Sequence, residues 1–336
     1  MSVAGTASRP ILALSRAEIA KTLEMSDVIE VVEQAHAALS TGDAVQAERS
    51  AIEVPGSTTL LVPMTAAIAP QGVAGIKLLT DTPANAERSL PVQQSTVVLV
   101  DAETGSCEAI LDGPVLTLFR TAAASAVATR HLARPDSRTL GLVGAGAQAR
   151  AHLDALSCVL PIDKVVVWSR SRSTVEAFAA YARERVAEVI VAEGPEEVIR
   201  TADVLCTLTP SREPLVRGEW FEPGLHVNAV GAPPRPDHRE IDTEGIVRSL
   251  VVVDSYDVAR RESGEVLVPL SEGAITAEHF RTELGDVITG ARKGRRTDDD
   301  VTLYDSVGLG IQDVAAARLA VDAARRTGLG VELRLR

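Results

Sequence analysis

The chain has 336 residues, which is long enough for two domains of ordinary size because single hydrophobic cores rarely grow beyond roughly 250–300 residues. Its 46% hydrophobic and 24% charged residues are typical of a folded globular protein and argue against disorder. The formal net charge of −12 argues against a surface that neutralises phosphates, so we expect no nucleic-acid partner.

The first third of the chain predicts a unit of mixed helix and sheet. Residues 17–41 are expected to form two helices that separate near Ser26, which would cap the second. The β-rich runs 58–62, 73–79 and 96–101 are separated by Pro, Gly and Asn. This spacing favours an antiparallel or mixed sheet over βαβ units.

An Ala-rich helix is predicted from Thr117 to Leu132 and ends before Pro135, which makes it a natural connector between domains. Beyond it, apolar strand patterns alternate with helical patterns, which predicts a parallel, doubly wound sheet of the Rossmann type. A last amphipathic helix is expected over 311–325, and the sequence does not tell which domain it packs on. The strand patterns lie at 139–143, 164–168, 189–191, 203–207, 224–230 and 250–254, and helices are expected from about 147, 173 and 196.

A glycine-rich turn lies between the first of these strands and its helix. The run Gly144-Ala145-Gly146-Ala147-Gln148-Ala149 therefore has the strand–turn–helix setting that a dinucleotide-binding motif requires. Gly144 allows the tight turn, Gly146 lets the backbone approach a pyrophosphate, and the small Ala149 lets helix and strand pack closely. The pyrophosphate would sit at the helix N-terminus, where unpaired N–H groups and the helix dipole favour anions. The alternative is an ordinary loop turn.

The end of the second strand distinguishes the two nicotinamide nucleotides. An NAD site places Asp or Glu there, about 20 residues beyond the turn, to bind the ribose hydroxyls. Here the strand 164–168 ends in Ser169-Arg170-Ser171-Arg172, which offers hydroxyl donors and two guanidinium groups to a 2′-phosphate. We therefore predict NADP (NADPH) as the cofactor, in preference to NAD. The alternative is a solvated basic turn.

Several stretches together resemble the ornithine cyclodeaminase and mu-crystallin family, from about residue 15 to about residue 325 and in the family's order. An ordered set of this kind is far more specific than any single motif. The stretches are Gly75-Ile76-Lys77, Asp101-Ala102-Glu103-Thr104-Gly105, Leu116-Thr117-Leu118-Phe119-Arg120-Thr121-Ala122-Ala123, the turn at Gly144, Asn228-Ala229-Val230-Gly231-Ala232, Pro236-Asp237-His238-Arg239-Glu240-Ile241-Asp242 and Asp305-Ser306-Val307-Gly308.

The resemblance implies a homodimer whose subunits act on amino acids or their cyclic imines. Residues 1–118 and 307–336 would form a discontinuous α+β dimerisation and substrate domain, and residues 119–306 a Rossmann dinucleotide-binding domain. It also implies that a basic trio, Arg49, Lys77 and Arg120, holds the substrate carboxylate.

The sequence around two of these cations supports that role independently. Lys77 lies inside an apolar strand pattern, and Arg120 stands at the start of an otherwise apolar, Ala-rich helix. Buried cations are costly unless an anion meets them, and a substrate carboxylate would be such an anion. The alternative for each cation is a structural ion pair with one of the chain's acidic residues. Arg49 stands among polar residues, so the resemblance alone singles it out.

One position departs from the resemblance. Cyclodeaminases and alanine dehydrogenases of the family carry an aspartate after the Asn-Ala-Val-Gly-Ala strand, where it helps to handle the substrate's amine. Pro233, Pro234 and Arg235 follow that strand here, and Asp237 or His238 is an open candidate to replace the missing group. Imine reduction needs less acid–base help than ornithine cyclisation.

We therefore predict an NADPH-dependent reductase of a cyclic or linear ketimine carboxylate. Its catalysis would depend mainly on the orientation of two bound reactants. Lys77, or water, would supply the proton. Two other hypotheses stay open. The first is an ornithine cyclodeaminase or an alanine-type amino-acid dehydrogenase with the same fold. The second is a non-catalytic, crystallin-like protein that binds NADPH without turnover.

Other residues bear on cofactor contacts, metal binding and location in the cell. Cofactor contacts are also predicted at strand ends where a Rossmann crevice opens, from Thr207, Thr209 and Val230. The three cysteines and six histidines lack metal-ligand spacing, so we expect no metal, and the basic run 292–296 reads as a solvated loop. No apolar run approaches the ~20 residues that span a bilayer. We expect a soluble, unprocessed, cytoplasmic protein with no membrane partner.

Overall fold

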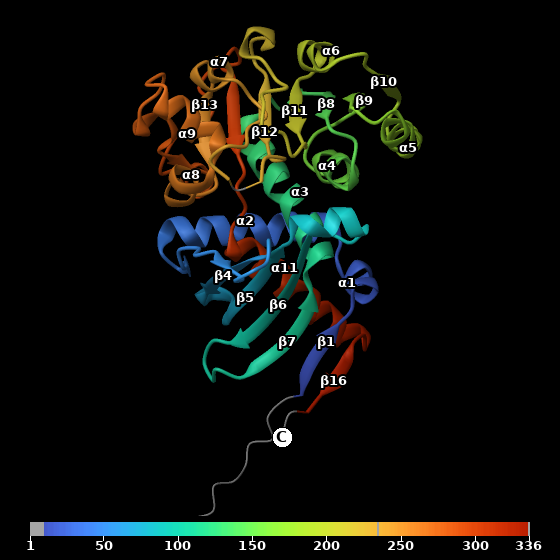
Figure 1. Ribbon diagram of the computed structural model, residues 1–336, viewed down its shortest axis with the longest axis vertical. Helices are drawn as coiled ribbons and strands as arrows, with labels where there is room; N and C mark the ends of the chain where they lie inside the picture. Colours follow the sequence, from blue (N-terminus) through green and yellow to red (C-terminus); the bar gives the residue numbers. More distant parts are fainter. Residues whose placement is uncertain (1–9, 234, 335–336) are drawn as a thin grey trace, which may run out of the picture.

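The chain folds into two units, each built on its own sheet (Figure 1). The computed structural model describes residues 10–233 and 235–334, so the ends 1–9 and 335–336 of the predicted dimerisation domain lie outside the described residues, as does Pro234. Helix α3 (Gly113–Leu132) leads from the mixed-sheet unit, at the bottom of Figure 1, into the Rossmann unit above it. The chain returns after strand β15 (Thr302–Asp305). The domain limit at residue 118 falls within α3 and stays a prediction.

The mixed-sheet unit confirms the expected mixed sheet. Its strand order is β16-β1-β7-β6-β5-β4-β2, with β3 beside β4. Strands β1 and β7 run parallel, and the other neighbours run antiparallel. The strands are β1 (Ile11–Leu14), β2 (Ala44–Gln46), β3 (Ile52–Glu53), β4 (Leu60–Ile68), β5 (Val73–Asp81), β6 (Gln93–Asp101), β7 (Cys107–Asp112) and β16 (Val331–Leu333).

One face of this sheet is covered and the other is not. Helix α11 (Gly310–Thr327) packs against β4, β5 and β6, behind the sheet in Figure 1, so the last helix belongs with this unit. Side chains alternate between the faces of a strand, and in β5 Lys77 is buried on the α11 side while its neighbour Leu78 is 41% exposed. Ile76, Val98 and Ile110 lie in register across that uncovered face.

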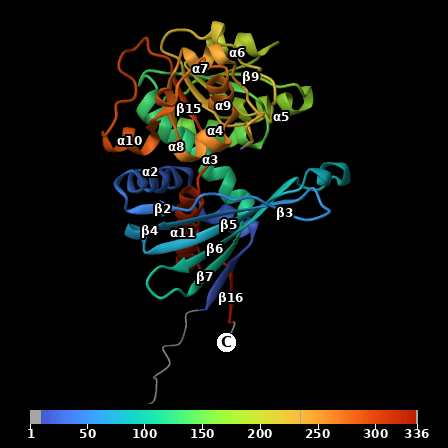
Figure 2. The same cartoon turned by 60° about the vertical axis from the view of Figure 1, so that its left-hand side comes forward.

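Helix α2 (Met25–Thr41) lies at the boundary between the units. It packs against both α11 and α3, and α1 (Arg16–Thr22) precedes it. Both views show α2 lying across the top of the mixed sheet, below the Rossmann unit (Figures 1 and 2). Two short 3-10 helices, η1 (Ala69–Gln71) and η2 (Pro83–Arg88), connect the strands of the mixed sheet.

The Rossmann unit is a fully parallel sheet, as predicted. Its strand order, β10-β9-β8-β11-β12-β15-β13-β14, reverses direction between β8 and β11, where a doubly wound fold opens its ligand crevice. Strand β8 is a nearly continuous buried apolar run, which is typical of a strand covered on both faces. Besides β15, the strands are β8 (Thr139–Val143), β9 (Lys164–Trp168), β10 (Glu188–Val191), β11 (Val204–Thr207), β12 (His226–Ala229), β13 (Leu250–Val253) and β14 (Thr282–Glu283).

Helices pack on both sides of this sheet. Helix α6 packs against β8 and β9, whereas α4 packs against α3, where buried His152 Nε2 lies 3.0 Å from Ser125 Oγ. The helices are α4 (Ala147–Ser157), α5 (Arg172–Arg183), α6 (Pro195–Thr201), α7 (Thr243–Val247), α8 (Tyr256–Glu262), α9 (Gly264–Ser271) and α10 (Leu284–Thr289), with 3-10 turns η3 (Gly218–Trp220) and η4 (Ala277–Phe280).

Some sequence expectations need correction. The break between the first two helices falls at Leu23 and Glu24, so Glu24 is the N-cap and Ser26 lies inside α2. Helix α3 starts at Gly113 rather than Thr117, because Pro114 is well suited to a first helical turn. The run 292–296 is not merely solvated, since Arg295 donates to the carbonyls of Leu132 at 2.7 Å and Gly224 at 3.0 Å.

Candidate active site

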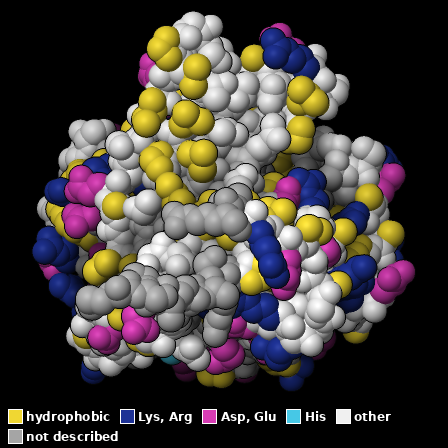
Figure 3. Space-filling view, turned by 90° about the horizontal axis from the view of Figure 1, so that it is seen from below, with side chains coloured by type: hydrophobic (Ala, Val, Ile, Leu, Met, Phe, Trp, Pro, Cys, Tyr) yellow, Lys and Arg dark blue, Asp and Glu magenta, His cyan; other side chains and the backbone are white. Residues whose placement is uncertain are grey.

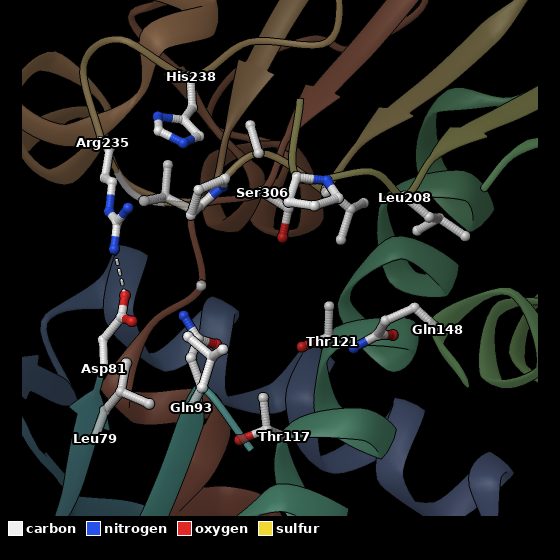
Figure 4. A pocket seen from close by; sticks show the side chains of 18 of the residues that line it. Leu79, Asp81, Gln93, Thr117, Thr121, Gln148, Leu208, Arg235, His238 and Ser306 are labelled. Atoms are coloured by element: carbon white, nitrogen blue, oxygen red, sulfur yellow. Dashed lines mark hydrogen bonds and ion pairs between the residues drawn. The ribbon is translucent and has the colours of Figure 1, made fainter. Parts of the chain in front are cut away.

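A cavity of about 760 Å³ lies between the two units (Figure 4). Its lower wall comes from β5, β6 and α3, and its upper wall comes from the loops that follow β11 and β12. Thr117 and Thr121 of α3 and Gln148 of α4 stand at the end nearest the phosphate turn. The cavity therefore lies at the carboxyl edge of the Rossmann strands, where open α/β sheets bind their ligands.

The three predicted cations, Arg49, Lys77 and Arg120, all line this cavity. Lys77 comes from β5, Arg120 from α3, and Arg49 from the segment between β2 and β3. Their side chains are almost fully buried, with exposed fractions of 2%, 8% and 7% for Lys77, Arg120 and Arg49. The fold thus brings together three cations that are far apart in the sequence.

Two carboxylates form direct ion pairs with these three cations. Lys77 Nζ and Arg120 Nε donate to the same oxygen of Asp313, at 3.1 and 3.2 Å. Arg49 Nη1 donates to Glu262 at 3.0 Å. The second terminal nitrogen of Arg49, Nη2, is buried and has no hydrogen-bond partner among the described residues. A third carboxylate, buried Asp254, lies near this group: burial raises its pKa to about 6, and the charges of Arg49 and Arg120 oppose that shift. Three cations thus face three carboxylates, and Arg49 Nη2 remains a donor without an acceptor among the described residues.

Burial and charge set the protonation of this cluster. Burial lowers the pKa of Lys77 to about 8; the negative charge of Asp313 opposes this shift, and nearby Arg120 adds to it. Burial alone would raise the pKa of Asp313, but Arg120 and Lys77 outweigh it and hold that pKa below its ordinary value. Asp313 is therefore ionised at neutral pH, and Lys77 is a more acidic ammonium than an exposed lysine.

Other buried groups fix the guanidinium of Arg120. Its Nη1 donates to Gln312 Oε1 at 2.8 Å, and Gln312 Nε2 lies 3.0 Å from Nε2 of buried His36. Gly308 has a φ of +85°, and a Cβ added there would lie 2.7 Å from Arg120 Nη1. Only glycine lets the backbone approach Arg120 this closely in that conformation.

The phosphate turn has the geometry that a dinucleotide needs. Gly144 has a φ of +114°, and a Cβ there would lie 2.8 Å from the carbonyl oxygen of Leu208. A Cβ added to Gly146 would meet nothing within 4 Å, so the space in front of the α4 N-terminus is open. Gly146 is the N-cap and has no side chain to occupy the free N–H groups. These features fit a bound pyrophosphate.

The basic run lies beside this turn, because Gly144 N donates to the carbonyl of Trp168 at the end of β9. Ser171 is the N-cap of α5 and accepts from the backbone N–H of Thr174. Arg172 pairs with Glu176 on the same helix, and Arg170 is exposed. Of the four residues in the run, Ser169 and Arg170 thus have no role in the helix.

The predicted cofactor residues separate into two groups. Gln148 and Val230 line the cavity, whereas Thr207 and Thr209 are absent from its described lining. The hydroxyls of Thr207 and Thr209 both donate to Glu240 at 2.7 Å, and Glu240 also accepts from the backbone of Thr209 and of Gly231. Burial raises the pKa of Glu240 to about 7, and these hydrogen bonds oppose the shift. The two threonines thus tie the strand-end loops together.

The outer end of the cavity carries further polar groups. Asp81 accepts from Arg235 Nη2 at 2.6 Å, and Gln93 lies beside them (Figure 4). His238 also lines the cavity. Its Nδ1 lies 2.9 Å from Asp237 Oδ1, and its Nε2 accepts from Arg212 Nε at 3.4 Å. Both ring nitrogens of His238 are therefore engaged.

Sequence reasoning missed Asp313, Gln312 and Asp81. Asp313 stands in the first turn of α11, where an acidic residue has an ordinary explanation in the helix dipole. The better signal was that Gln312 and Asp313 are polar residues next to an apolar, Ala-rich helical face. In the part of the chain described, no group of three or more His, Cys, Asp or Glu residues could hold a metal ion, and no helix is long and apolar enough to span a bilayer.

Comparison with known proteins gives consistent matches over most of the chain. The model of the ornithine cyclodeaminase/mu-crystallin family matches residues 11–328. A ketimine reductase mu-crystallin of Mus musculus is 37% identical over 282 residues, which cover 84% of this chain and 86% of that protein.

Two solved structures share the fold. The structure of Thermococcus litoralis Delta(1)-pyrroline-2-carboxylate reductase in complex with NADH and L-proline has a TM-score of 0.90 and 35% identity, and covers 96% of this chain and 100% of that one. An archaeal alanine dehydrogenase dimer with bound NAD has a TM-score of 0.91 and 32% identity, and covers 97% and 99% of the two chains. The match over residues 11–328, together with these relatives, shows that the chain belongs to the ornithine cyclodeaminase/mu-crystallin family.

Proposed function

We propose that this chain is a cytoplasmic, homodimeric enzyme that uses NADPH to reduce the C=N bond of a cyclic or linear ketimine carboxylate, yielding an amino or imino acid. The cation cluster carries the proposal, because Arg49, Lys77 and Arg120 line one cavity at the nucleotide edge, and buried Arg49 Nη2 lacks a protein acceptor in the described part of the chain. Relatives named ketimine reductase and pyrroline-2-carboxylate reductase, the latter holding NADH and L-proline, support imine reduction with a nicotinamide nucleotide.

Arg49, Lys77 and Arg120 bind the substrate carboxylate in this proposal. Guanidinium groups match carboxylates with paired, charge-assisted hydrogen bonds, and burial strengthens such bonds. Gln312 and Gly308 keep Arg120 in place, so the bound carboxylate fixes the position of the imine carbon. Orientation of this kind is a large part of catalysis between two bound reactants. The nicotinamide nucleotide, when bound, supplies the hydride.

Lys77 Nζ donates the proton that the imine nitrogen requires. Burial lowers the pKa of Lys77 to about 8, so its ammonium releases a proton more readily than an exposed lysine does at neutral pH. Asp313 remains 3.1 Å from Nζ and stabilises the ammonium when Lys77 regains a proton from solvent. Carboxylate binding and proton donation thus share one side chain.

The wall of the cavity favours imine reduction over ornithine cyclisation. Pro233 lines the cavity at the point where cyclodeaminases of this family carry their aspartate. Asp237, which follows, is 65% exposed and paired with His238. His238 in turn has both ring nitrogens engaged, so neither residue supplies a free acid–base group for the amines of ornithine.

A screen of nucleotide consumption tests the proposal against its rivals. We expect NADPH oxidation with pyrroline-2-carboxylate and piperideine-2-carboxylate, and with 2-oxo acids in the presence of methylamine. Ammonia release from L-ornithine without net NADH formation would identify a cyclodeaminase instead. Nucleotide oxidation that occurs with a 2-oxo acid and ammonia, but not with the cyclic imines, would identify an amino-acid dehydrogenase. Tight NADPH binding with no turnover of any compound would favour a binding protein.

The preference for NADPH rests on the residues that follow β9. Replacing Arg170 by Ala is expected to lower kcat/KM for NADPH about 10–100-fold, because a hydrogen bond between charged groups contributes about 1.5–3 kcal/mol. The same variant should use NADH as the wild type does, since NADH has no 2′-phosphate. Initial rates with both nucleotides measure the change. A wild-type protein that uses NADH as well as or better than NADPH would refute the preference.

The face of the mixed sheet that no helix covers supports the homodimer, since a contiguous patch of accessible apolar side chains marks a contact surface. A row of β-branched side chains, Ile76, Val98 and Ile110, crosses that face. Figure 3, which views this end of the molecule, shows a group of hydrophobic side chains on a lobe with few charges. The homologous alanine dehydrogenase is a dimer.

Val98→Lys is expected to convert the dimer into a monomer, because a lysine there would bury an unpaired charge in the interface. Light scattering after size-exclusion chromatography measures the mass. Val191→Lys is the matched control, since Val191 is 47% exposed on the Rossmann unit. A dimeric Val98→Lys protein would place the contact elsewhere.

A further inference from the structure

A second cavity lies against the outer end of the first. It has a volume of about 290 Å³. Apolar side chains of Leu60 and Val62 line much of it, together with Arg261 and Glu262 of α8. The residues that line both cavities are Arg49, Leu79, Asp81, Gln93 and Arg235. These shared side chains therefore form the partition between the two spaces.

An ion pair that joins the two units closes this partition. Arg235 Nη2, from the loop after β12, donates at 2.6 Å to Asp81 Oδ2 at the end of β5 (Figure 4). The Asp81 side chain is 8% exposed, and that of Arg235 is 32% exposed. Short charge-assisted bonds of this kind are among the stronger hydrogen bonds in proteins.

Asp81 lies on the same strand, β5, as Lys77 of the cation cluster, so the strand sets the distance between the cluster and the partition. Lys77 and Asp81 are buried on the same face of the strand, with Leu79 between them. Four residues of strand span about 13 Å. A substrate whose carboxylate meets Lys77 would thus extend its side chain along Leu79 towards the Asp81–Arg235 pair.

We propose that the Asp81–Arg235 ion pair is a specificity-determining wall, which limits the length of the substrate's side chain. The wall makes the enzyme favour imine carboxylates with short or ring-closed side chains over those with long or aromatic ones. This inference rests on the proposed function, because it places the substrate carboxylate at the Lys77 end. Removing the wall would join the two cavities and admit larger side chains.

The test compares the binding of two products by calorimetry. L-Alanine and L-phenylalanine are titrated into protein saturated with the oxidised nucleotide that it uses. The variant is Asp81→Ala/Arg235→Ala, because removing one partner alone would leave an unpaired charge. The matched control is Glu48→Ala, which breaks a different ion pair between the same two units, Glu48–Arg261; Glu48 lies outside both cavity linings.

We expect the wild type to bind L-alanine at least about tenfold more tightly than L-phenylalanine, since a single methylene in a fitted pocket changes specificity about 10–200-fold. The double variant should reduce this ratio about tenfold or more, and the control should keep it. Two results would contradict the proposed wall. One is an unchanged ratio of the two affinities in the double variant, and the other is equal binding of both amino acids by the wild type.

Turnover of pyrroline-2-carboxylate by the wild type, measured alongside, tests the proposed function separately. Turnover with an unchanged binding ratio would contradict only the wall. A shifted ratio without any imine turnover would contradict only the reductase. Failure of the wild type to bind either amino acid would overturn the wall, and the absence of imine turnover as well would overturn both proposals.

Discussion

Replacing Lys77 by Met is expected to lower kcat/KM for pyrroline-2-carboxylate about 10³-fold or more. The variant loses a buried charge that pairs with the substrate carboxylate and also a proton donor, and a positioned donor alone contributes about 10²–10⁴-fold. Binding of the nucleotide, followed by its fluorescence, should stay unchanged. Lys21→Met is the control, because Lys21 is exposed on α1 and distant in sequence from the cluster. Wild-type rates in Lys77→Met would remove Lys77 from the mechanism.

The pH dependence of binding separates the two roles of Lys77. Because the pKa of Lys77 is lowered to about 8, its charge is present below that pH and is lost as the pH rises through it. Affinity for a carboxylate product should therefore fall above about pH 8 in the wild type and stay flat in Lys77→Arg, whose guanidinium does not titrate there. Lys77→Arg should also keep KM near the wild-type value and lose kcat. The same fall in affinity in both proteins would assign the pH effect to another group.

Replacing Asp313 by Asn is expected to destabilise the fold strongly. Asp313 is the carboxylate that Lys77 and Arg120 share, and breaking a buried ion pair by removing one partner costs about 3–5 kcal/mol. For a chain of this size we expect the melting temperature to fall on the order of 10 °C. Thermal unfolding followed by circular dichroism measures this change. Carboxylate ligands should restore part of the stability, because they replace the missing negative charge.

A second aspartate of the same helix provides the control for this prediction. Asp322 pairs with Arg318 on α11, and its side chain is 47% exposed. Exposed ion pairs contribute about 0–1 kcal/mol, so Asp322→Asn should leave the melting temperature nearly unchanged. If the melting temperature of Asp313→Asn is no lower than that of Asp322→Asn, Asp313 does not stabilise the fold through the buried cations.

The sequence predicted the Rossmann unit best where local signals agree. Strands β8 and β9 and the start of α4 fall at the predicted residues, because a buried parallel strand is a continuous apolar run and the glycine turn marks the helix start. Strand β15 was not predicted, since Thr302–Asp305 is short and carries Tyr and Asp next to an acidic loop. Its burial depends on β12 and β13, which lie on either side of it.

The sequence predicted the cations of the candidate site but not their partners, because those contacts form only when distant segments pack together. A cation inside an apolar pattern signals that some anion must meet it, so Lys77 and Arg120 stood out. The sequence does not say which anion, because Asp313 lies 236 positions from Lys77 and meets it only when α11 packs on the sheet. The ion pair between Asp81 and Arg235 likewise exists only because the two units face each other across the cavity.

The proposal that this chain reduces imine carboxylates is tested most directly by the stoichiometry of one reaction. Purified protein, NADPH and pyrroline-2-carboxylate are mixed without ammonia, NADPH loss is followed by absorbance, and L-proline is quantified after the reaction stops. We predict equal amounts of NADPH consumed and L-proline formed, and loss of both in Lys77→Met. NADPH that stays unoxidised in the wild type, while the same protein converts L-ornithine or a 2-oxo acid with ammonia, would contradict the account.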